Sequence, residues 1–113
     1  MDFQPQFALM VNGALDFNAL LDVLRQTWAD REWLTRTTFV RDRNFVRVRP
    51  NEDAEPADSG ASDPLDYPYE IQVTPSAESV GVEDQVALAQ QMRSELETLG
   101  LQVAVVADFE ELL

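Results

Sequence analysis

The sequence predicts an α+β fold, a ferredoxin-like split βαβ sandwich with two helices on one face of a four- or five-stranded, mainly antiparallel sheet. Segments that alternate like strands and segments spaced like helices follow one another as strand, helix, strand pair, strand, helix, strand. Two amphipathic helices are too few to cover both faces of a sheet, so we expect the second face to be open. With 113 residues, 45% of them hydrophobic, the chain predicts one domain over residues 1–113.

The first strand and the first helix are predicted from the spacing of apolar residues. Phe7–Val11 is a short apolar run that ends at the turn-prone pair Asn12-Gly13. Asp16 stands in an N-cap position before a helix that extends to Trp28. One face of this helix carries an apolar stripe of Phe17, Leu20, Leu21, Leu24 and Trp28.

A strand pair follows, over Thr35–Arg41 and Phe45–Arg49. Turn-prone residues at Asp42–Asn44 predict a hairpin between the two strands. Because the Asn-Gly signature of a tight turn is missing, one long bent or bulged strand is an open alternative. If Phe39 points toward the helices, alternation directs Phe45, Arg47 and Arg49 toward the open face.

The second half of the chain repeats the pattern after an acidic loop. Asn51–Asp66 contains six acidic residues and two prolines, and we expect a mobile connector there. Tyr67–Val73 alternates like a half-buried strand. The second helix is predicted from Val82 to Leu99 and is ended by Gly100. Its inward stripe is predicted to be Val82, Val86, Ala89, Leu96 and Leu99. Leu101–Ala107 is so apolar that we expect a central strand buried on both faces.

The amino-acid composition weighs heavily against most classes of enzyme. The chain has no cysteine and no histidine, which excludes disulfides, thiolate metal sites and the commonest general base. It carries no glycine-rich phosphate loop and no GxSxG motif. We therefore expect a protein that is not an enzyme and needs no cofactor or metal. The residues before Phe7 are not basic and no apolar run approaches eighteen residues, so we expect a cytoplasmic protein without membrane contact.

The net charge of −13 is unevenly distributed. From Arg25 to Arg49 the chain has seven arginines and three acidic residues, a balance of +4, whereas the remainder has Arg93 and eighteen acidic residues. A GC-rich genome or a salty cytoplasm would both favour arginine and acidity without any functional reason. The pattern nevertheless predicts a basic stripe on an acidic body.

Two groups of residues are candidate binding sites. The first is an open sheet face, and the second is the acidic loop. The sheet-face candidates are Arg36, Arg41, Phe45, Arg47 and Arg49, and the loop candidates are Glu52, Asp53, Glu55 and Asp58. A structural alternative applies to the first group, because its arginines could pair with the protein's own carboxylates, such as Glu70 and Asp42.

These observations predict a small acidic, non-enzymatic protein-binding module, either an inhibitor or immunity-type protein or an oligomeric accessory protein. Its partner would be another protein or further copies of itself. The alternative is a sheet-face binder of nucleic acid or a small anionic ligand. This alternative is the weaker one, because the chain lacks an aromatic-Gly-aromatic signature and its net charge repels phosphate.

Overall fold

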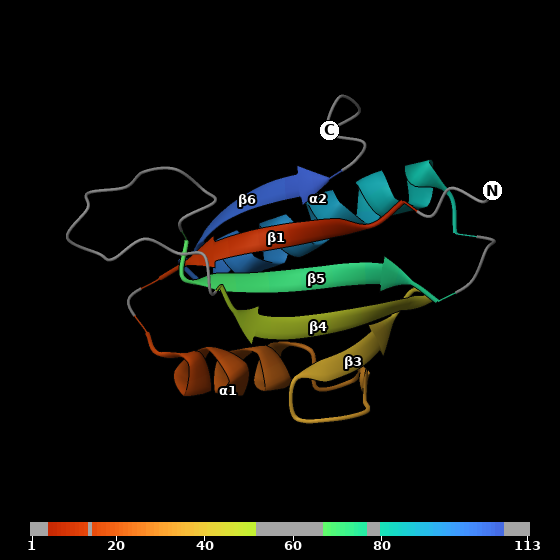
Figure 1. Ribbon diagram of the computed structural model, residues 1–113. Helices are drawn as coiled ribbons and strands as arrows, with labels where there is room; N and C mark the ends of the chain where they lie inside the picture. Colours follow the sequence, from red (N-terminus) through yellow and green to blue (C-terminus); the bar gives the residue numbers. More distant parts are fainter. Residues whose placement is uncertain (1–4, 14, 52–66, 77–79, 108–113) are drawn as a thin grey trace.

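The computed structural model describes residues 5–13, 15–51, 67–76 and 80–107. Along these ranges each of the two helices follows a strand, and four consecutive strands separate the first helix from the second (Figure 1). The elements are β1 (Phe7–Asn12), α1 (Phe17–Thr27), β2 (Glu32–Trp33), β3 (Thr38–Arg41), β4 (Asn44–Pro50), β5 (Tyr69–Pro75), α2 (Val82–Thr98) and β6 (Gln102–Ala107).

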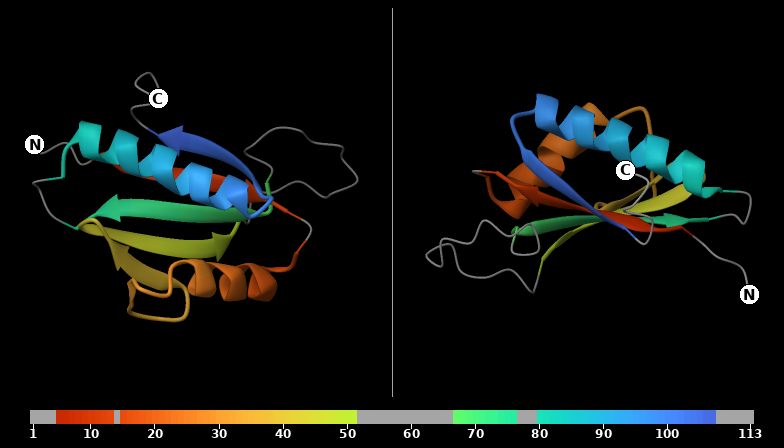
Figure 2. Two further views of the ribbon diagram at one scale, coloured as in Figure 1. Left: turned by 180° about the vertical axis from the view of Figure 1, so that it is seen from behind. Right: turned by 90° about the horizontal axis from the view of Figure 1, so that it is seen from above.

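The strands of the described ranges form one six-stranded sheet in the order β2-β3-β4-β5-β1-β6. Every neighbouring pair is antiparallel. β1 lies inside the sheet, between β5 and β6, while β2 and β6 form the two edges. Both helices lie on the same side of the sheet, as the view from above in Figure 2 shows. The protein therefore has a two-layer α+β architecture.

The predicted ferredoxin-like sandwich on a four- or five-stranded sheet is wrong. In the described part of the chain the sheet has six strands, and α1 is a short helix of 11 residues. The difference arises after α1, where Thr35–Arg41 was predicted as one strand. Instead the chain turns at Leu34–Thr37, and the N–H groups of Leu34 and Thr35 donate to the carbonyl of Thr38 at 2.8 and 3.2 Å. This turn pairs the two-residue β2 with β3 and so adds one more strand, β2, at the edge of the sheet.

The connection between β3 and β4 is a tight hairpin, which settles the alternative left open by the sequence. Arg41 pairs with Asn44, so two residues form the loop. Both have positive φ angles, 49° at Asp42 and 65° at Arg43, as a type I′ turn requires. Asparagine and glycine favour this conformation but are not obligatory for it, and therefore their absence did not prevent the hairpin.

Both helices begin where the sequence predicts and end within one residue of the predicted position. The Asp16 carboxylate accepts a hydrogen bond from the Ala19 N–H at 2.8 Å and caps α1. Asp84 accepts from the Gly81 N–H at 3.1 Å in the first turn of α2. After α2, Gly100 has a φ of 86°, and the N–H groups of Gly100 and Leu101 return to the carbonyls of Glu97 and Leu96. This pattern is a Schellman motif, which uses glycine because its left-handed φ is costly for other residues.

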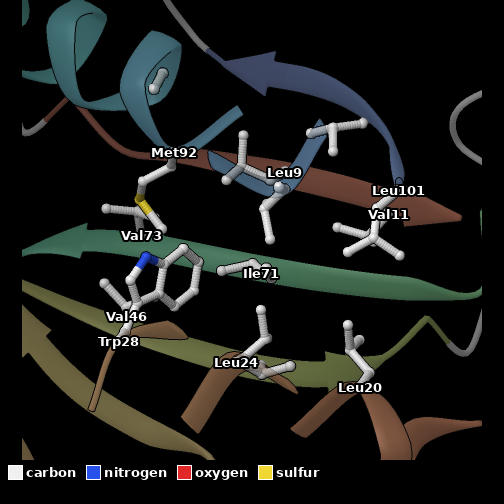
Figure 3. Packing of buried hydrophobic residues seen from close by; sticks show 14 of the residues in the cluster. Leu9, Val11, Leu20, Leu24, Trp28, Val46, Ile71, Val73, Met92 and Leu101 are labelled. Atoms are coloured by element: carbon white, nitrogen blue, oxygen red, sulfur yellow. The ribbon is translucent and has the colours of Figure 1, made fainter. Parts of the chain in front are cut away.

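The core fills the space between the helices and the inner sheet face. Leu24 and Trp28 from the α1 side and Met92 from α2 meet Val46 and Ile71 of the sheet (Figure 3). Aromatic rings extend this core toward β2, since the ring centroid of Phe39 is 5.2 Å from that of Trp28 and 4.5 Å from that of Trp33. Burial of each large apolar side chain stabilises the fold by roughly 1.5–3 kcal/mol.

Two sequence expectations about the second half are wrong in detail. β6 is an edge strand and not a central one, because β1 is its neighbour on one side and no described strand lies on the other. The buried stripe of α2 includes Gln85, whereas Leu99, which was expected inside, is 40% exposed. Apolar content alone therefore determined neither the position of the strand nor the rotation of the helix.

The hydroxyl of Tyr69 links β5 to the segment before α1 and should make stability depend on alkaline pH. It donates to the Leu15 carbonyl at 2.5 Å. Burial, with a smaller effect of the Asp16 carboxylate, raises the pKa of Tyr69 above its ordinary value of 10.0. The folded state then holds the phenolic proton more tightly than the unfolded state. Its stabilising effect is full below the unfolded pKa and is lost as pH rises through the folded pKa.

We therefore expect Tyr69→Phe to lower the free energy of unfolding at neutral pH by about 1 kcal/mol. Above a pH of about 10, the free energy of unfolding of the Tyr69→Phe variant should fall less steeply with pH than that of the wild type. Urea unfolding at a series of pH values checks this difference. Equal slopes for the two proteins would contradict the role given to Tyr69.

Candidate functional site

The β3–β4 hairpin presents different side chains to the two faces of the sheet. Phe39, Arg41, Asn44, Val46 and Val48 are buried and face the helices. The alternating positions face the other way, and the register places Val40 opposite Phe45 and Thr38 opposite Arg47. We call the side of the sheet opposite the helices the open face, because no described helix or strand covers it (Figure 2).

Among the described residues of the open face, the most exposed large apolar side chain is Phe45 on the hairpin. Phe45 is 46% exposed, whereas Met10, which occupies the same face on β1, is only 4% exposed. Met10 lies between Glu70 of β5 and Ala104 of β6 in the register. We call Thr38, Val40, Phe45 and Arg47 the β3–β4 patch.

Three of the five predicted sheet-face residues lie on the open face, namely Phe45, Arg47 and Arg49, and all three are exposed. Arg36 does not lie on the sheet. It belongs to the turn before β3, and its Nη2 donates to Asn18 Oδ1 of α1 at 2.6 Å. Arg41 lies on the opposite face and is only 2% exposed, so its assignment to the open face was wrong. The reason is period-2 alternation, since Arg41 has the same orientation as the buried Phe39.

The buried Arg41 forms an ion pair with Glu95 of α2, whose side chain is partly exposed. Its Nη1 lies 2.7 Å from Glu95 Oε1 and its Nη2 lies 3.3 Å from Glu95 Oε2, which is the bidentate geometry of guanidinium and carboxylate. The Trp28 Nε1–H also donates to Glu95 Oε1 at 3.1 Å, and the guanidinium lies 5.7 Å from the Trp28 ring centroid. One carboxylate thus joins β3, the end of α1 and α2.

A second polar pair joins the same hairpin to α2. Asn44 Nδ2 donates to Gln85 Oε1 at 3.1 Å, and Gln85 Nε2 donates back to Asn44 Oδ1 at 2.8 Å. Gln85 Nε2 also donates to the Pro5 carbonyl at 2.9 Å, and Asn44 Nδ2 to the Asp42 carbonyl at 3.0 Å. Because these amides are paired, they can be fully buried without the cost of unsatisfied polar groups. Sequence reasoning missed both residues, although Gln85 shares a helical stripe with Ala89, Met92 and Leu96.

Most arginines of the described ranges form ion pairs, hydrogen bonds or cation–π contacts within the protein. Arg49 Nε pairs with Glu70 Oε1 at 2.5 Å across the open face. Other ion pairs join Arg31 to Asp30, Arg43 to Asp84 and Arg93 to Glu97. Arg25 lies 4.7 Å from the Trp33 ring centroid and donates to the Arg36 carbonyl. Arg47, by contrast, forms no ion pair with any residue of the described ranges, so its charge is available to a partner.

Two shallow hollows accompany these surfaces. One of about 370 Å³ lies on the open face between Gln72, Thr74 and Val106. The other, of about 360 Å³, lies between the β3–β4 turn and α2 and is lined by Arg43, Asp84 and Gln85. Within the described ranges no group of three or more carboxylates is arranged to hold a metal ion.

The acidic-loop candidates Glu52, Asp53, Glu55 and Asp58 lie outside the described residues, and their role stays a prediction. No helix in the described part of the chain is long and apolar enough to cross a membrane.

No protein-family model, curated protein or solved structure matches the chain.

Removal of the Glu95 carboxylate tests the ion pair with Arg41. Glu95→Ala removes the bidentate partner of the buried Arg41 guanidinium and leaves it only the Asp42 carboxylate, 3.8 Å from Nε, so we expect a loss of about 2 kcal/mol in the free energy of unfolding. The matched control is Glu97→Ala, which removes an exposed ion pair with Arg93 and should cost less than about 0.5 kcal/mol.

The combined change Arg41→Met and Glu95→Gln should recover most of the loss. The amide oxygen introduced on α2 can still accept from the Trp28 indole, and no buried charge remains. Urea unfolding measures all three variants. If Glu95→Ala cost no more than Glu97→Ala, the pair would not have the structural importance assigned to it.

Proposed function

We propose that the protein is a small non-enzymatic binding module that acts by protein–protein contact through the β3–β4 patch. The observation that supports this proposal best is the exposure of Phe45 beside Arg47, whose charge has no partner among the described residues. Large exposed aromatic residues and arginine are the types enriched at energetically important interface positions.

The patch is rigid, which favours binding. Phe45 and Arg47 alternate with Asn44, Val46 and Val48, all of which are anchored in the core. The hairpin is closed by a two-residue turn, and β4 is paired on both sides, with β3 and β5. A preorganised surface loses little conformational entropy on binding, so more of the contact energy contributes to affinity.

The chemistry of the patch indicates the surface that would fit it. Val40 and Phe45 are cross-strand partners and offer an apolar platform, while Arg47 next to them can pair with a carboxylate. We infer a partner surface that presents an apolar side chain flanked by an acidic group. Because the whole chain has a net charge of −13, this acidic group must be a local feature of a partner that is not strongly acidic overall.

The nucleic-acid alternative has less support. Arg36 and Arg41 do not lie on the open face, and the Arg49 charge is paired with Glu70. On the described part of the open face, one arginine without an ion pair beside one aromatic ring is a small platform for a polyanion, which usually needs several phosphate contacts. The absence of histidine and cysteine from the sequence is the reason why the proposal is non-enzymatic.

Affinity capture from a lysate of the source organism tests the patch. The immobilised wild-type chain should retain at least one protein, and Phe45→Ala combined with Arg47→Glu should reduce that retention about tenfold or more. Both substituted side chains are exposed, so the fold should be unaffected, which circular dichroism can check. The control is Arg93→Glu on α2, which changes the net charge by the same amount and should leave capture unchanged.

The wild type, the double variant and the Arg93→Glu control should also be tested for binding to a labelled single-stranded oligonucleotide at low salt. Retention that depends on Arg47 would favour the nucleic-acid alternative over the proposal. Equal protein capture by the wild type and the double variant would show that the β3–β4 patch is not the binding surface.

A further inference from the structure

The two edges of the sheet differ in their protection against pairing with another strand. β2 has only two residues, one of them the exposed Glu32, and the Trp33 Nε1–H is tied to the Trp28 carbonyl at 3.0 Å. β6, with the sequence QVAVVA, has six residues, no charge and no proline. Edge strands are normally protected by short length, charges, proline or bulges, and β6 has none of these devices.

The chemistry of this edge specifies an extended strand as the ligand. On one side, the backbone of β6 pairs with β1 in a continuous register, from the pair Asn12 and Gln102 to the pair Phe7 and Ala107. No described strand lies along the other side from Gln102 to Val106, where alternate N–H and C=O groups point outward. Ala104, Val105 and Val106 are all partly exposed, so an added strand would also cover apolar surface.

We propose that this strand is β6 of a second copy of the chain, paired antiparallel about a two-fold axis perpendicular to the sheet. Such an interface is self-complementary, because the same backbone groups meet on both sides. The axis keeps the open faces of both copies on one side, so Ala104 and Val106 of one copy lie opposite Ala104 or Val106 of the other. Neither residue is charged, and β6 therefore brings no like charges into contact.

Charge also defines how this association must respond to salt. Each copy has a net charge of −13, so two copies repel each other at long range while their β6 edges do not. Added salt screens the repulsion and should strengthen the dimer. If a strand from a different, basic protein bound at this edge instead, added salt would weaken the binding. The proposal goes beyond the β3–β4 patch, since β5 and β1 separate β4 from β6 in the sheet.

Sedimentation velocity of the full chain over a range of concentrations, at about 50 mM and about 500 mM NaCl, tests the proposal. The wild type should be in monomer–dimer equilibrium, with more dimer at the higher salt concentration. Ala104→Lys combined with Val106→Lys places lysine opposite lysine and should raise the dimer Kd about tenfold or more. Lysine is chosen because it lowers the net negative charge, so a weaker dimer cannot result from greater long-range repulsion.

The matched control is Gln26→Lys combined with Ala29→Lys, at exposed positions on the α1 side of the molecule. It adds the same charge away from β6 and should dimerise at least as well as the wild type. Hydrogen exchange of the wild type gives a second measurement that needs no variant. Amides between Gln102 and Val106 should exchange more slowly as protein concentration rises, whereas those of β3 should not change.

A monomeric wild type at both salt concentrations would overturn the proposal, as would dimerisation of the lysine variant with unchanged Kd. A dimer that is lost in the Phe45→Ala, Arg47→Glu protein but kept in the lysine variant would place self-association at the β3–β4 patch instead. Failure of this proposal leaves lysate capture through the patch untouched, because the two experiments depend on different strands.

Discussion

Arg41 and Asn44 are buried polar residues of the β3–β4 hairpin, and much of the structure follows from the partners that their side chains find on α2. Arg41 and Asn44, which face each other across the turn, meet Glu95 and Gln85 of α2. A shift of one residue in either strand would turn these side chains to the other face and leave their helix partners unsatisfied. The two pairs therefore fix which side of the hairpin faces inward. They also determine that Phe45 and Arg47 face outward.

The arginine-rich stretch shows why sequence charge is weak evidence for a binding surface. Its local balance of +4 suggests one basic stripe, but the side chains go to different places. Arg41 enters the core, Arg43 and Arg49 meet carboxylates of α2 and β5, and Arg36 contacts α1. Arginine is suited to such varied use, because its long apolar stem and planar fork can satisfy buried and exposed partners alike.

Local signals could be predicted from the sequence, whereas pairings between distant segments could not. Asp16 and Gly100 act within a few residues, so the ends of the helices were predictable. Alternation with Phe39 already indicated that Arg41 faces inward, but burial of an arginine is costly without a partner, and Glu95 lies 54 residues away. Gln85 is 41 residues from Asn44. The two-residue β2 is too short to show any periodicity, and the expected sheet consequently had too few strands.

The unequal edges of the sheet also limit how far strand pairing can extend. If β6 pairs with β6 of a second copy, the unprotected edge is used up in both molecules, and β2 forms both ends of the joined sheet. Glu32 is exposed there, and β2 offers only two residues for pairing. A self-complementary interface of this kind closes at two copies, whereas pairing of unlike edges would continue into a fibre. The short β2, which the predicted fold lacked, is therefore the element that would keep a β6-mediated assembly finite.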